Sequence, residues 1–147
     1  MLRKIFAPLV VAPFISHAST SNTQEFQRMS ASAECLAYIL IFDEKEQTAS
    51  TDKVKTLAEV YKSAAKKVMA SNEMKQTLSQ GLFAKSGVDF SNEFYAGSIM
   101  AGAREDTVAS IKRSVDESRP SANEKINELW SFEAHKRYAS SNCDLIK

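Results

Sequence analysis

Glycine and proline are scarce in this chain of 147 residues, which contains four glycines and three prolines. Turns between strands use these two residue types at fixed positions, so their scarcity argues against a fold made of many short strands. Alternation of apolar and polar residues with a period of two is also almost absent. These absences predict an all-α fold.

Residues that carry catalysis or bind metal ions are equally few. The chain has two cysteines and two histidines, of which His17 falls in a segment predicted below to be removed. Two thiols and His135 do not complete a tetrahedral zinc site. No Gly-x-Ser-x-Gly turn is present to expose a serine nucleophile, and the acidic run at 43–46 lacks the glycine of a calcium loop. The sequence therefore predicts a protein that is not an enzyme, without metal or cofactor.

Neither sign of charge dominates the chain. Nineteen lysines and arginines face 18 acidic residues, and the loss of Arg3 and Lys4 with the N-terminal segment would leave 17 basic residues. A balance this close to neutral gives no reason to expect nucleic acid or an anionic membrane surface as a partner. A protein partner fits better.

The N-terminus has the three parts of a secretion signal. Residues 1–4 are positively charged, residues 5–15 are apolar, and Ser16-His17-Ala18 forms a small-x-small cleavage site. The apolar run is shorter than the roughly 20 residues of a membrane-spanning helix, so no anchor is expected after cleavage. The sequence predicts a signal peptide at 1–18 and a single helical domain at 19–147. We expect the periplasm, with secretion as the alternative.

Cys35 and Cys143 are the two cysteines of the chain, and they stand near opposite ends of the predicted mature protein. Two thiols in one exported domain usually form a disulfide, because the compartment is oxidising. The bond would join the first helix to the C-terminal tail. The first and last helices are therefore predicted to be neighbours in a bundle.

Apolar residues recur at spacings of three and four along most of the mature chain, which is typical of amphipathic helices. In the first helix the stripe consists of Phe26, Met29, Ala33, Leu36 and Leu40. About five helices are predicted, at 23–42, from 50–52 to 68, from 72 towards 86, at 91–118 and at 121–140. Residues 43–48 are predicted to form a loop, and the first two helices an antiparallel hairpin.

Capping residues mark several of these boundaries. Asn72 and Ser91 are predicted to cap the third and fourth helices, and Gly87 to end the third in a left-handed conformation. Gly97 and Gly102 lie inside the fourth helix, where each costs about 1 kcal/mol relative to alanine. We expect a second helix to pack closely on this bare backbone. A kink or a ligand pocket is the alternative.

Large apolar residues crowd around the turn at Ser86-Gly87, where polar residues are usual. They would either close one end of the bundle, with Phe90 stapling the fourth helix, or form an exposed binding surface. The candidate binding residues are Leu82, Phe83, Val88, Phe90, Phe94 and Tyr95.

The signal, the segment Cys-Leu-Ala-Tyr-Ile at 35–39 and the Cys-Asp-Leu at 143–145 resemble small helical periplasmic immunity proteins. Those proteins neutralise amidase effectors of type VI secretion. The resemblance implies an inhibitor of a secreted or periplasmic enzyme, and no functional residue is carried over from it. Two alternatives remain. One is a small-ligand-binding or stress-response protein with a pocket beside Gly97 and Gly102, and the other is an enzyme that works with carboxylates alone.

Overall fold

The computed structural model describes residues 20–87, 89–118 and 125–147, without the side chains of Thr20, Ser21, Leu82 and Phe83. The predicted signal peptide lies outside these residues. The described part contains no strand, so the predicted all-α fold is confirmed. Its elements are α1 (Thr20–Ile39), α2 (Glu44–Ala49), α3 (Thr51–Ala70), α4 (Asn72–Ser79), α5 (Leu82–Lys85), α6 (Asn92–Ser118), α7 (Ile126–Ser140) and a short 3₁₀ turn, η1 (Cys143–Leu145).

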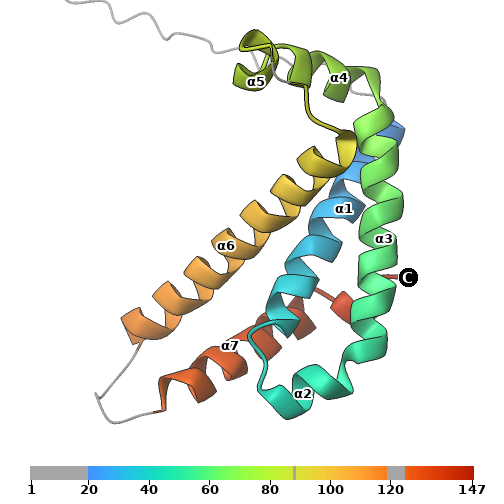
Figure 1. Cartoon of the computed structure of the whole chain (residues 1–147). Helices are drawn as coiled ribbons and strands as arrows, with labels where there is room; N and C mark the ends of the chain where they lie inside the picture. The colour runs from blue at the N-terminus through green and yellow to red at the C-terminus, as the bar shows by residue number, and fades with distance from the viewer. Residues whose placement is uncertain (1–19, 88, 119–124) are drawn as a thin grey trace, which may run out of the picture.

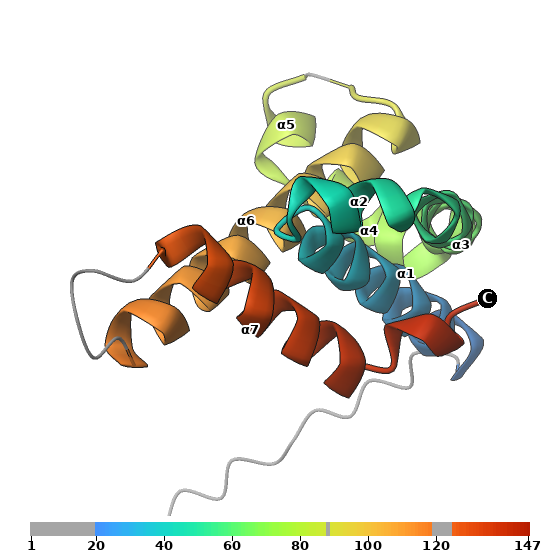
Figure 2. The ribbon, with the colours of Figure 1, turned by 90° about the horizontal axis from the view of Figure 1, so that it is seen from below.

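Helix α1 lies in the middle of the bundle, with α3 on one side and α6 and α7 on the other (Figures 1 and 2). The start of α1 contacts the end of α3, where Lys67 Nζ lies 2.6 Å from Glu25 Oε1 and Asn22 Nδ2 donates to Ser71 Oγ at 3.3 Å. The predicted antiparallel hairpin is therefore confirmed. Helices α4 and α5 lie at one end of the bundle, and α2 and α7 at the other.

Helix α2 occupies the segment predicted to be a loop, so that prediction was wrong. The Asp43 side chain caps the helix by accepting from the Glu46 amide at 2.9 Å. The side-chain amide Nε2 of Gln47 donates to the backbone carbonyls of Leu40 and Phe42, at 3.1 and 2.7 Å. These two bonds hold α2 against the end of α1. No residue of α2 is buried. The helix is stabilised by these side-chain bonds and has no apolar stripe that periodicity would reveal.

The predicted third helix is divided into α4 and α5 at Gly81. Gly87 has a φ of +74°, the left-handed conformation expected there. The cap of α4 is Ser71, whose hydroxyl accepts from the Met74 amide at 3.2 Å, and not Asn72 as predicted. Ser91 does cap α6, by accepting from the Phe94 amide at 3.2 Å.

Replacing Ser71 by alanine should lower the free energy of unfolding by about 1 kcal/mol, because the Met74 amide loses its acceptor. The matched variant is Asn72→Ala, one residue along at an exposed position. It should change stability by less than about 0.5 kcal/mol. Urea unfolding of the two variants measures both effects. Equal losses in both would show that Ser71 is not the cap.

The core has two parts. One surrounds a disulfide between Cys35 and Cys143, whose Cα atoms are 5.7 Å apart, so the predicted bond is confirmed. This part takes Ile39 from α1, Leu57 from α3, Ile111 from α6 and Ala134 from α7, and α1 and α7 are neighbours as expected. The second part joins α1 to α3 and contains Met29, Ala33, Tyr61, Ala64, Ala65, Val68 and Met69.

Two members of the predicted α1 stripe are not in the core. Phe26 is 47% exposed and Leu40 is 55% exposed, whereas Met29 and Ala33 are completely buried. Leu40 is the residue that follows the last residue of α1. Leu40 is available for another surface of the molecule, described below.

Tyr38 should make the stability of the fold depend on pH in the alkaline range. Burial, together with the hydrogen bond from the Tyr38 hydroxyl to Glu34, raises the pKa of this phenol to about 12. Because the folded value lies above the unfolded value of about 10, the contribution to stability is complete below pH 10 and is lost as the pH rises towards 12. Urea midpoints measured between about pH 9 and about pH 11 should therefore fall less in Tyr38→Phe than in the unmodified protein. An identical fall in both would exclude this phenol as the cause.

The close helix packing predicted at Gly97 and Gly102 was wrong. A Cβ added at either glycine would meet no described atom within 4 Å apart from its chain neighbours and the nearby backbone of α6 itself. Gly97 is exposed and Gly102 is half-buried. The residues that hold α6 to its neighbours are others, among them Ile99, Ile111 and Val115.

Candidate functional site

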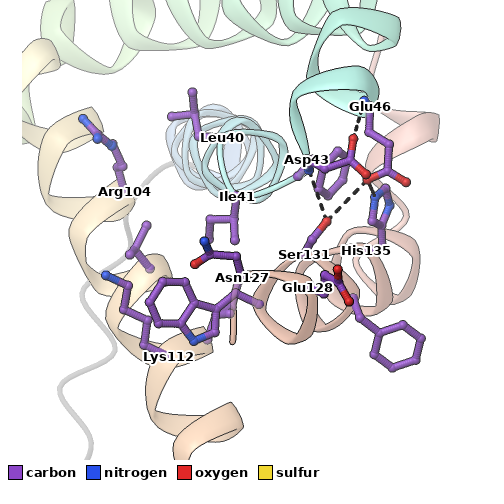
Figure 3. Close-up of a pocket in the computed structure, with 15 residues that line it drawn as sticks. Leu40, Ile41, Asp43, Glu46, Arg104, Lys112, Asn127, Glu128, Ser131 and His135 are labelled. Atoms are coloured by element: carbon purple, nitrogen blue, oxygen red, sulfur yellow. Dashed lines mark hydrogen bonds and ion pairs between the residues drawn. The ribbon is translucent and has the colours of Figure 1, made fainter. Parts of the chain in front are cut away.

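A surface groove lies where the end of α1, α2, α6 and α7 meet (Figure 3). Its volume is about 690 Å³. Its floor is apolar and includes Ile41, Val108, Ile111 and Trp130. Leu40 and Phe132 also line it, and they are 55% and 71% exposed. The groove therefore combines a hollow with large apolar side chains that face solvent.

One wall of the groove is a polar network between α2 and α7. Glu46 Oε2 lies 2.7 Å from His135 Nε2 and accepts from the Ser131 hydroxyl at 3.3 Å (Figure 3). The Asp43 amide donates to Ser131 Oγ at 3.2 Å. The His135 ring also stacks on Phe42, with centroids 3.6 Å apart. These contacts fix α2 on α7 and give the groove a rigid side.

The same network bears on catalysis. The Ser131 hydroxyl is bonded to the Glu46 carboxylate, and the imidazole of His135 is bonded to the same carboxylate oxygen. In a hydrolase triad the imidazole itself must accept the serine proton. Here the carboxylate lies between the two groups, so the arrangement is not that of a Ser-His-Asp triad.

The opposite wall is formed by α6 and carries Arg104 and Lys112, both exposed. Lys112 Nζ lies 4.6 Å from the centroid of the Trp130 ring, which is a cation–π contact. The indole Nε1 of Trp130 is buried and has no partner among the described residues. Trp130 thus forms part of the floor mainly through its ring.

No metal site accompanies the groove in the described part of the chain. Those residues contain no group of three or more histidine, cysteine or acidic side chains that could hold a metal ion. Both cysteines are in the disulfide.

Phe90, Phe94 and Tyr95, three of the predicted binding residues, lie just before α6 or in its first turn. This start of α6 is at the other end of the bundle from α2 and α7 (Figure 1). Phe90 stacks on Phe94, with centroids 4.1 Å apart, and meets Tyr95 edge-on at 6.3 Å. Tyr95 packs against the second part of the core, while Phe94 is 43% exposed. A hollow of about 440 Å³ adjoins Phe90 and Tyr95. Phe90 thus contacts the first turn of α6, as a staple does.

Three of the six predicted residues lie outside this description. Nothing is described of Val88 or of the side chains of Leu82 and Phe83. Phe90, Phe94 and Tyr95 are brought together, and a binding role for this cluster stays a prediction. The groove was not predicted, because its residues come from four separate segments. The one signal in the sequence was the single tryptophan, Trp130, two residues before Phe132. The structure shows that Phe132 is exposed.

Comparison of the chain with protein-family models, with characterised proteins and with solved structures finds no match. None of the described helices is both long enough and apolar enough to cross a membrane.

Proposed function

We propose that the protein is exported to the periplasm and acts there by binding. In this proposal it inhibits a secreted or periplasmic enzyme, as an immunity protein does, and catalyses no reaction itself. The disulfide between Cys35 and Cys143 is compatible with an exported protein, since such bonds persist in oxidising compartments.

The groove is the observation that supports a binding function. Large aromatic side chains at the edge of a hollow are what protein-binding hot spots are made of, and Phe132 is such a side chain, 71% exposed. Leu40 adds a second exposed apolar group to the same surface. The network of Glu46, Ser131 and His135 holds the groove in shape before a partner arrives, which lowers the entropic cost of binding.

The test uses the mature protein as bait in periplasmic extract and in secretions of competing bacteria. We expect capture of a specific enzyme whose activity falls when the protein is added. Phe132→Ala combined with Leu40→Ala should weaken this complex by about tenfold or more, because both side chains are buried by the partner. Circular dichroism should show an unchanged fold, since both residues are exposed.

Two matched variants locate the surface. Leu145→Ala removes an apolar side chain that is 73% exposed and does not line the groove, so it should leave affinity unchanged. Phe94→Ala tests the predicted aromatic cluster at the other end of the bundle. If Phe94→Ala alone abolished the complex, the binding surface would lie at the aromatic cluster and not at the groove. Failure to capture any enzyme that the protein inhibits would reject the function.

A further inference from the structure

The charges lining the groove are not equally compensated. On the wall formed by α2 and α7, Asp43 caps α2, Glu46 is bonded to His135, and Glu128 Oε1 lies 2.9 Å from Lys125 Nζ. Each of these carboxylates already has a partner within the protein. The carboxylates of this wall are therefore engaged with groups of the protein itself.

The wall formed by α6 differs. Within the part of the chain that the structure describes, neither Arg104 nor Lys112 takes part in an ion pair. Lys112 lies over the face of Trp130, which attracts the ammonium without neutralising it. The cations at the groove that have no ion-pair partner among the described residues thus belong to α6.

The two cations also have a defined spacing. Arg104, Val108 and Lys112 are each four residues apart and lie on one face of α6. At 1.5 Å per residue, the two cationic residues are separated by about 12 Å along the helix. Val108 and the apolar floor lie between them. One small carboxylate cannot contact both cations, whereas a peptide segment with acidic groups about two helical turns apart can.

We propose that the groove binds a segment of a partner protein whose apolar side chains are flanked by acidic residues. The apolar side chains rest on Trp130, Ile41 and Val108, and the acidic groups pair with Arg104 and Lys112. The guanidinium of Arg104 suits a carboxylate because its donors match the two carboxylate oxygens. This inference rests on the proposed function and specifies the chemistry of the partner.

The probe is a displayed library of random peptides of about 16 residues, long enough for four helical turns. It is selected on the mature protein and counter-selected on Phe132→Ala combined with Leu40→Ala. We expect the enriched peptides to carry aspartate or glutamate on both sides of an apolar stretch. Selection on Arg104→Glu combined with Lys112→Glu should enrich lysine or arginine at those positions instead.

Affinity is then measured with synthetic copies of the enriched peptides that contain no tryptophan. Trp130 is the single tryptophan of the chain and lines the groove, so its fluorescence reports occupancy. The double charge reversal should lower the affinity for an acidic peptide by about tenfold or more, since each paired cation is replaced by a repelling anion. Glu105→Lys, an exposed charge change of opposite sign on α6 outside the groove lining, serves as the control and should not weaken it.

Several results would overturn the inference. They are enriched peptides without acidic residues, no peptide enriched over the counter-selection variant, or equal affinity in the charge-reversed protein. A fatty carboxylate that saturates the Trp130 signal as tightly as the peptide would assign the groove to a small ligand. Self-association abolished by the charge reversal would assign it to a second copy of the chain.

The two proposals fail separately. If an enzyme is captured and depends on Phe132 and Leu40 but not on Arg104 and Lys112, the function stands and the acidic partner segment is rejected. If acidic peptides bind the groove but no enzyme is inhibited, the recognition chemistry stands and the inhibitory function is rejected.

Discussion

Replacement of Cys35 and Cys143 by alanine is expected to lower the free energy of unfolding by about 4 to 5 kcal/mol. The bond joins residues 108 positions apart, and closing a loop of that length removes much of the freedom of the unfolded chain. Domains of this size usually have about 5 to 15 kcal/mol of stability, so a large part of it depends on one bond. Urea unfolding of the double variant and the oxidised protein measures the difference.

Reduction of the native protein provides an independent check. The cysteines are 1% and 0% exposed, so a reducing agent reaches the sulfur atoms only when the structure opens. Thiol labelling of the oxidised protein, unfolded in denaturant without a reducing agent, should detect no free thiol. A decrease below about 1 kcal/mol in the double alanine variant would mean that the unfolded chain is already restricted without the bond.

Leu57→Ala should produce the second largest effect, a fall of about 3 kcal/mol in the free energy of unfolding. Leu57 is completely buried and brings α3 into the part of the core that surrounds the disulfide. Its truncation removes apolar contacts and leaves a cavity that rigid neighbours fill only in part.

The same substitution at Leu145 is the matched control for Leu57, since Leu145 is 73% exposed. It should change the free energy of unfolding by no more than about 0.5 kcal/mol. Neither residue lines the groove, so both variants should bind a partner normally while they are folded. Similar losses in the two variants would contradict the packing described for Leu57.

The five predicted helices have counterparts in α1, α3, α4, α6 and α7, because each carries apolar residues at helical spacing. The disulfide was predictable because an exported domain with two cysteines has one way to pair them. Helix α2 was not predictable from periodicity, since its stability comes from Asp43 and Gln47 bonding to backbone groups. The third helix is divided at Gly81, and no apolar pattern marks that break.

The candidate site was harder to predict than the fold. Trp130 packs against the core, but its ring also forms part of the floor of a groove that needs α6 beside it. Leu40 was expected in the core, but it is exposed and lines the groove. Gly97 and Gly102 suggested a close contact that is absent, since glycine in a helix indicates space without indicating what fills it.

Cys143 follows the seven α-helices of the described residues, which bears on when the disulfide can form. During synthesis the bond cannot form until α7 has been made, so Cys35 has no partner while the earlier helices are made. We expect the hairpin of α1 and α3 to form earlier, because its contacts join residues 42 and 49 positions apart, against 108 for the two cysteines. We therefore expect oxidation to come late in folding and to lock contacts that α1 and α3 have already made.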